Sequence, residues 1–129
     1  MWDPGYSPSY FDAMEWRAAG GTFLGLGPAA AWMRMRVPLV AGEPISPLSR
    51  VLVAADSGNG ISMELPLPDF LFINTELTVH LARMPVGEWV CLDAVSRIGP
   101  RGVGVAQSVL WDERSRFGAG AQALLVAPR

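Results

Sequence analysis

The chain has 129 residues, of which 50% are hydrophobic and 17% charged, and its formal net charge is −2. This length suits one domain and is too short for two independent cores of normal size. No apolar run reaches the roughly 20 residues that span a bilayer, and the N-terminus lacks the basic start and apolar segment of a signal peptide. We therefore expect a soluble, cytoplasmic protein without a membrane partner.

The counts of metal-binding and basic residues narrow the function further. One cysteine, Cys91, and one histidine, His80, are too few for the usual zinc shell, so we expect no metal, and no other residue pattern indicates a cofactor. The ten basic residues, all arginine, are scattered among twelve acidic residues, which does not favour a nucleic-acid partner. The low share of charged residues indicates instead that some apolar surface contacts another protein.

The first part of the chain contains a lead-in and two predicted strands. Residues 1–12 hold two prolines, one glycine and four aromatic residues without a period, which indicates an extended lead-in or linker before a single domain at residues 13–129. Strands are predicted at residues 14–17 and 31–37, because the second segment alternates apolar side chains with bulky or charged ones. The glycine-rich residues 20–28 would form the loop between them.

One long helix is predicted at residues 46–62, and the rest of the chain would be organised around it. Ser46 can cap its N-terminus, and a proline at position 47 suits the first turn. One apolar face is formed by four residues at helical spacing, namely Leu48, Val51, Leu52 and Ala55. Asp56 falls close to this face, where a carboxylate is unusual, and the glycines at 58 and 60 would end the helix.

From residue 70 to the end, the pattern is typical of strands. Apolar and more polar side chains alternate in the order Leu77, Thr78, Val79, His80, Leu81 and Ala82. Residues 89–97 and 103–111 flank a Gly-Pro-Arg-Gly turn and would pair as a hairpin, followed by a strand at residues 117–126. The predicted fold class is therefore α+β, with a curved antiparallel sheet of about six strands wrapped around one long helix.

Four stretches of the sequence carry a resemblance to a known family. They are AADSGNG on the predicted helix, FINTELTVHLAR on the next strand, GEWVCLDAVSR after it and GAGAQALLVAPR at the end. In this order they resemble the C-terminal half of the acyl-CoA thioesterase II family, the double hot dog thioesterases, over nearly everything from Phe11 onward. The resemblance implies a hot dog fold, a role in fatty acyl metabolism and a second hot dog module as partner.

The resemblance also implies three catalytic residues. In the family, a helix Asp, a strand Thr and a Gln on the last strand together orient the water that attacks the thioester. The Asp position falls on Asp56 and the Gln position on Gln122. The Thr position falls on Asn74, with Thr75 one residue further, so an amide replaces the family hydroxyl or the hydroxyl is displaced.

These side chains also suit the chemistry without the resemblance. Thioester hydrolysis needs a water held by acceptors, together with donors where the carbonyl oxygen becomes negative. Asp56 can accept a proton, while the amides of Asn74 and Gln122 offer both oxygen acceptors and N–H donors. Structural alternatives remain open. Asp56 could cap nearby amides, Gln122 could form a hydrogen bond across the sheet, and Asn74 could mark a strand entry or bulge.

Other candidate residues carry weaker hypotheses. The strand alternation places His80 opposite the apolar face, so a surface or interface histidine is favoured over a general base. Cys91 lies between two apolar residues, and packing is favoured over a nucleophilic role. Met33 and Met35 could line an acyl channel, although core positions are favoured.

The function that the sequence favours is hydrolysis of acyl-CoA thioesters to free acid and CoA. The alternative is a catalytically silent acyl-binding or structural hot dog module that pairs with an active partner. A hot dog dehydratase would need a His and Asp pair at the helix, and His80 lies elsewhere. The second module would be another copy of the chain, forming a homodimer, or a separate N-terminal half, and pairing would cover an open sheet edge.

Overall fold

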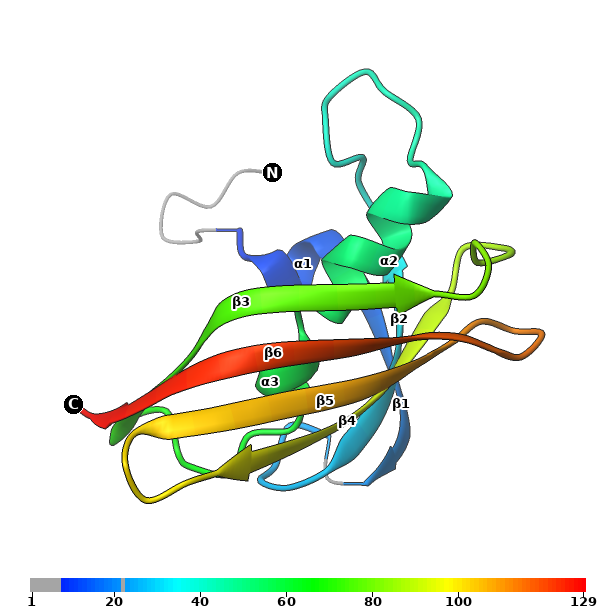
Figure 1. The fold of residues 1–129 in the computed structure, drawn as a ribbon. Helices are drawn as coiled ribbons and strands as arrows, with labels where there is room; N and C mark the ends of the chain where they lie inside the picture. The colour runs from blue at the N-terminus through cyan, green and yellow to red at the C-terminus, as the bar shows by residue number, and fades with distance from the viewer. Residues whose placement is uncertain (1–7, 22) are drawn as a thin grey trace.

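The fold is a six-stranded sheet that curves around its helices in the computed structural model, which describes residues 8–21 and 23–129 (Figure 1). The strands are β1 (Met14–Gly21), β2 (Ala29–Met35), β3 (Phe70–Leu81), β4 (Val90–Ile98), β5 (Val103–Trp111) and β6 (Arg116–Pro128). The helices are α1 (Tyr10–Ala13), α2 (Pro47–Ala55) and α3 (Gly58–Ile61). The strand order is β1-β2-β4-β5-β6-β3, and each neighbouring pair is antiparallel. The predicted α+β class with a curved antiparallel sheet is confirmed.

The prediction of one long helix at residues 46–62 is wrong, because the helix is interrupted after Ala55. Its start is as expected, since Ser46 Oγ accepts a hydrogen bond from the N–H of Ser49 at 3.0 Å and a proline follows. At the end of α2 the N–H of Ser57 donates to Ala54 O, three residues back, and not to the carbonyl four residues back as in an α-helix. The single turn α3 then follows, and the helical part is two short segments joined by a turn at Asp56 and Ser57.

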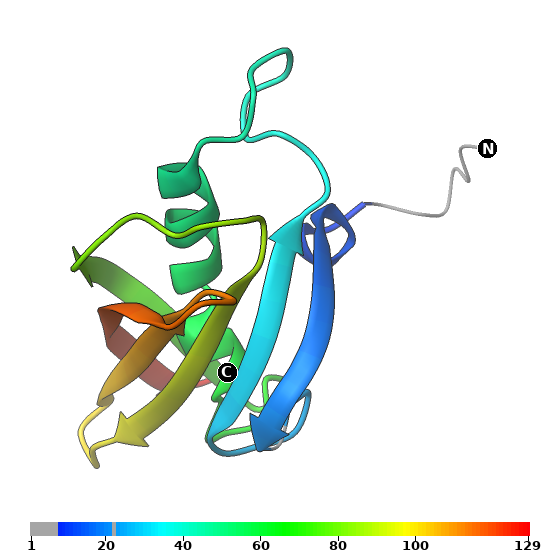
Figure 2. The same ribbon diagram turned by 90° about the vertical axis from the view of Figure 1, so that its right-hand side faces the viewer.

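The apolar face of α2 also differs from the predicted one. Val51, Ala54 and Ala55 are buried, whereas Leu48 and Leu52 are each 42% exposed. Figure 2 shows α2 inside the curve of the sheet, between the β1–β2 edge and the β3 edge. The helix therefore buries a narrow face against the sheet and leaves two leucines in contact with solvent.

The N-terminal lead-in is not wholly extended. Residues 10–13 form the helical turn α1, because the N–H and the hydroxyl of Ser9 both donate to the carboxylate of Asp12, at 2.8 and 2.9 Å. Residues 1–7 of the predicted lead-in lie outside the part of the chain that the structure describes. The turn α1 packs its rings on β1, where Phe11 and Trp16 have ring centroids 4.9 Å apart.

The strand pattern at the C-terminal end of the chain is confirmed. Leu77, Val79 and Leu81 of β3 pack against the core, while Thr78, His80 and Ala82 are exposed. Strands β5 and β4 match the predicted hairpin within one residue, and β2 ends at Met35, two residues before the predicted end. The largest fully buried side chains of the core are Phe117, Met33, Leu92, Leu110, Val51 and Val90.

Within the described residues, no helix is long and apolar enough to cross a lipid bilayer.

Candidate active site

Asp56 lies at the break between α2 and α3, where it forms the C-cap of α2 with an exposed side chain. Asn74 on β3 donates a hydrogen bond from Nδ2 to Asp56 Oδ1 at 2.8 Å. An ionised carboxylate has about four acceptor positions on its two oxygens, so this single bond leaves acceptor capacity for a water. The structure therefore joins two of the three predicted catalytic residues, from elements 18 residues apart in the chain.

A bulge in β3 brings Asn74 rather than Thr75 to this position. The pairing of β3 with β6 skips one residue at Thr75. Thr75 Oγ1 donates to Ala123 O at 3.3 Å, and the carboxylate of Glu76 accepts from the Ala123 N–H at 3.2 Å. Side chains of the bulged segment thus bond the main chain of β6 where the ladder is irregular. The hydroxyl of Thr75 faces β6, and the amide of Asn74 faces Asp56.

Gln122 on β6 holds the main chain of the turn that carries Asp56. Its side chain is buried, with the residue only 2% exposed. Nε2 donates to Asp56 O at 3.1 Å, and Oε1 accepts from the N–H of Asn59 at 2.9 Å. A Cβ at position 58 would lie 2.9 Å from this Oε1, so glycine at 58 allows the close approach. Gln122 satisfies main-chain groups that the interrupted helix leaves available, and it thereby positions the turn.

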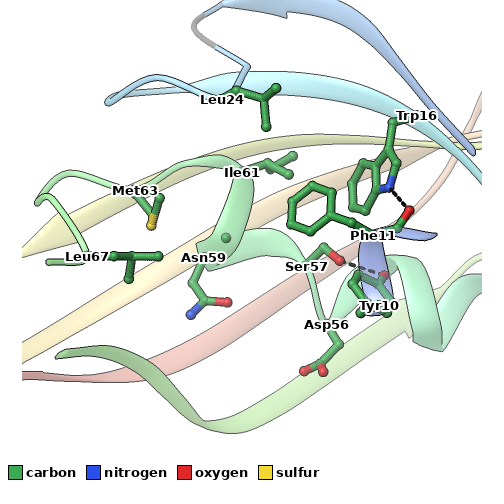
Figure 3. Close-up of a pocket in the computed structure, with 11 residues that line it drawn as sticks. Tyr10, Phe11, Trp16, Leu24, Asp56, Ser57, Asn59, Ile61, Met63 and Leu67 are labelled. Atoms are coloured by element: carbon green, nitrogen blue, oxygen red, sulfur yellow. Dashed lines mark hydrogen bonds between the residues drawn. The ribbon is translucent and has the colours of Figure 1, made fainter. Parts of the chain in front are cut away.

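An apolar pocket of about 390 Å³ borders Asp56 (Figure 3). Figure 3 shows Phe11 and Trp16 on one side of it and Met63 and Leu67 on the other. The complete lining is Tyr10, Phe11, Trp16, Leu24, Asp56, Ser57, Asn59, Gly60, Ile61, Met63 and Leu67. Volumes of this order and a lining that is mostly apolar with a few polar groups are typical of small-molecule sites.

The weaker candidates of the sequence lie away from this pocket. His80 is exposed on β3, in agreement with the strand alternation. Cys91 is buried, and burial raises the pKa of its thiol to about 11, which disfavours a nucleophilic thiolate. Met33 is part of the hydrophobic core. Among residues 8–21 and 23–129, no three His, Cys, Asp or Glu side chains lie close enough to hold a metal ion.

Sequence reasoning missed the contribution of α1 to the site. Tyr10 forms a hydrogen bond with Val53 O at 2.9 Å and lies 2.7 Å from Ser57 Oγ, next to Asp56. Phe11 and Trp16 form an aromatic wall of the pocket. The signal was the density of aromatic residues before β1, which indicates packing but carries no period that would place them.

The chain belongs to the family of acyl-CoA thioesterase C-terminal domains, whose model matches residues 1–126. None of the curated protein sequences matches it significantly. Solved structures match it at low sequence identity and therefore show the fold alone.

The acyl-CoA thioesterase II TesB2 from Mycobacterium marinum aligns with a TM-score of 0.71 and 16% identity over 98% of this chain and 56% of its own. A TesB protein from Mycobacterium avium subspecies paratuberculosis aligns with a TM-score of 0.66 and 13% identity, over 99% of this chain and 55% of its own. A thioesterase family protein from Silicibacter pomeroyi aligns with a TM-score of 0.65 and 13% identity, over 88% of this chain and 85% of its own. The hot dog fold is thus confirmed, and the chain spans about half of each TesB protein.

Proposed function

We propose that the chain hydrolyses acyl-CoA thioesters with a water held between Asp56 and Asn74. The observation that carries this proposal is the Asp56–Asn74 pair, a carboxylate with free acceptor capacity at the border of an apolar pocket. Membership in the acyl-CoA thioesterase C-terminal domain family supports the choice of substrate class. The acyl chain would lie in the pocket and its thioester carbonyl near Asp56.

In the proposed reaction, Asp56 accepts a proton from the water as the water oxygen attacks the thioester carbonyl carbon. Asn74 keeps the carboxylate oriented and offers Oδ1 as a second acceptor for the water. The tetrahedral intermediate then collapses, the carbon–sulfur bond breaks, and the CoA thiolate leaves with the proton that Asp56 had accepted, which returns Asp56 to its ionised form. The role of Gln122 is to hold the turn in place, because its amide bonds the main chain at Asp56 and Asn59.

The test is release of free CoA thiol from acyl-CoA by the purified chain and by Asp56→Asn. We expect the substitution to lower kcat by roughly 10²–10⁴-fold, as is typical for loss of a general base, with nearly unchanged affinity for acyl-CoA. Asp93→Asn is the matched control, because Asp93 is an exposed aspartate on β4. Equal rates for Asp56→Asn and the control would exclude Asp56 as the base.

A second candidate function is a silent acyl-binding or structural module. It is favoured by Gln122, whose oxygen and nitrogen both bond main-chain groups, and by an amide at Asn74 where the family has a hydroxyl. A thioether analogue of acyl-CoA, which cannot be hydrolysed, separates the two functions. If it raises the melting temperature while acyl-CoA releases no thiol above background, this second function applies.

We further propose that a second hot dog module pairs with β3, one of the two edge strands of the sheet. The edge presents unpaired main-chain groups. Helix α2, which carries the exposed Leu48 and Leu52, lies near this edge (Figures 1 and 2). We expect the isolated chain to sediment as a dimer at micromolar concentration, and Leu52→Glu to shift it to monomer. Leu39→Glu, in the loop before α2, is the control. A wild-type monomer would favour a separate N-terminal half as partner.

A further inference from the structure

The interruption between α2 and α3 leaves the carbonyl of Val53 without its usual helical donor. In a continuous helix this carbonyl would accept from the N–H of Ser57, but that N–H bonds Ala54 O at 3.0 Å. The hydroxyl of Tyr10 lies 2.9 Å from Val53 O and donates to it. A side chain from α1, 43 residues earlier in the chain, thus satisfies a main-chain group that the break releases.

The same hydroxyl fixes the side chain of Ser57. Tyr10 Oη lies 2.7 Å from Ser57 Oγ. A tyrosine hydroxyl has one proton, and because that proton goes to Val53 O, Ser57 must donate to Tyr10. Ser57 is nearly buried and directly follows Asp56. Its orientation therefore constrains the main chain on the C-terminal side of the proposed base.

Two side chains thus hold the turn on either side of Asp56. Gln122 from β6 bonds the main chain at Asp56 and Asn59, and Tyr10 from α1 bonds Val53 and Ser57. Figure 3 shows Tyr10, Ser57 and Asp56 together at one end of the pocket. The ring of Tyr10 is itself held by an edge-on contact with Trp16, at 5.8 Å between centroids.

We propose that Tyr10 is a positioning residue for Asp56, acting through Ser57 and Val53. The inference rests on the proposed function, since it assigns the hydroxyl a part in holding the base. Desolvation raises the pKa of Tyr10, so the hydroxyl keeps its proton and remains a donor at neutral pH. The ring also lines the pocket, and the acyl chain therefore packs against the same side chain that holds the turn.

The central experiment compares Tyr10→Phe, Ser57→Ala and the double variant on one acyl-CoA substrate. Tyr10→Phe removes the hydroxyl and keeps the ring, so we expect kcat to fall about 10-fold with KM within twofold of wild type. Ser57→Ala should act in the same direction. The double variant should be little worse than the stronger single variant, because the two hydroxyls act as one unit. A raised KM with unchanged kcat would overturn the inference and leave Tyr10 as pocket wall only.

Ser62→Ala is the structural control for this comparison. Ser62 Oγ donates to Gly58 O at 2.6 Å in the same helical region, but it lies on the side of Ser96, to which it is also hydrogen-bonded. Its loss should lower the melting temperature without lowering kcat at a temperature well below unfolding. An equal loss of kcat in Ser62→Ala and Tyr10→Phe would show general loosening and overturn the proposal.

A readout independent of activity separates this inference from the proposed function. The side-chain NH₂ of Asn74 donates to Asp56 and gives its own signals in a ¹⁵N–¹H correlation spectrum. We expect Tyr10→Phe to shift these signals and Ser62→Ala to leave them in place. If wild type hydrolyses nothing, the proposed function fails, and a shifted Asn74 signal still supports positioning by Tyr10. Unshifted Asn74 signals in Tyr10→Phe overturn the inference whether or not the chain is active.

Discussion

Two aspartates of this chain, Asp56 and Asp112, have opposite surroundings. Asp112 is 3% exposed and accepts five hydrogen bonds, two from the guanidinium of Arg83 and three from the N–H groups of Val86, Arg114 and Ser115. Asp56 is exposed, and within residues 8–21 and 23–129 its carboxylate accepts one side-chain bond, from Asn74.

The contrast distinguishes a carboxylate used for stability from one available for chemistry. The bonds from Arg83 hold the pKa of Asp112 well below its usual range, and all its acceptor positions are occupied by the protein. Asp56 is instead held through its main chain by Gln122, which leaves carboxylate positions free for a water. We therefore propose that Asp112 serves the fold and Asp56 the site, and the following substitutions test this division.

The largest effect on stability is expected from Asp112→Ala. The substitution leaves the guanidinium of Arg83 and three N–H groups without their shared acceptor, so we expect the free energy of unfolding to fall by about 3 kcal/mol. Urea denaturation measures this loss, and hydrolysis below the melting temperature should be unaffected. Asp93→Ala, at an exposed position, should change stability by less than about 0.5 kcal/mol. A loss that small in Asp112→Ala would contradict the division.

Gln122→Ala should affect both stability and rate, because this residue joins the fold to the site. Removing the amide takes away the hydrogen-bond partner of Asp56 O and of the Asn59 N–H, at a cost of about 1–3 kcal/mol in unfolding free energy. We expect kcat to fall by about 10-fold, less than in Asp56→Asn. Gln107→Ala, which removes an exposed glutamine on β5, is the control for both measurements. Full activity of Gln122→Ala would remove Gln122 from the site.

The smallest expected effect is a pH dependence of the Asp112 contribution. A carboxylate whose pKa is lower in the folded than in the unfolded state stabilises the fold above the unfolded pKa of about 3.9. As the pH falls below that value, the stability difference between wild type and Asp112→Ala should shrink, by at most about 1.4 kcal/mol per pH unit. Urea titrations between neutral and acidic pH measure it. A difference that stays constant into this acidic range would contradict the lowered pKa.

The strands could be predicted because their signal is local. Alternation along β3 depends only on one apolar face, so the inward side of Leu77, Val79 and Leu81 follows from the sequence. The helix was harder, because the turn that interrupts it is bonded by Gln122, a residue 66 positions from Asp56 that reaches the turn only in the folded chain. The helical periodicity before Ala55 carries no information about Gln122.

The candidate site could be predicted only in part, because some of its contacts are likewise formed only in the folded chain. The resemblance placed Asp56, Asn74 and Gln122 together, and the structure brings all three to one turn. The choice between Asn74 and Thr75 depends on a bulge, which changes by one residue which side chains point to each face of the strand. The period of the sequence does not reveal such a bulge. Tyr10 was missed because its partners Val53 and Ser57 are defined by the helix break.

The bulge at Thr75 has a consequence for how neighbouring molecules recognise one another. It divides the edge strand β3 into two shorter segments that differ in phase, Phe70 to Asn74 and Glu76 to Leu81. An incoming strand can follow one segment in register but loses alignment at the next, so stacking of many copies in a uniform ladder is discouraged. We therefore expect the feature that aims Asn74 at Asp56 also to oppose open-ended aggregation.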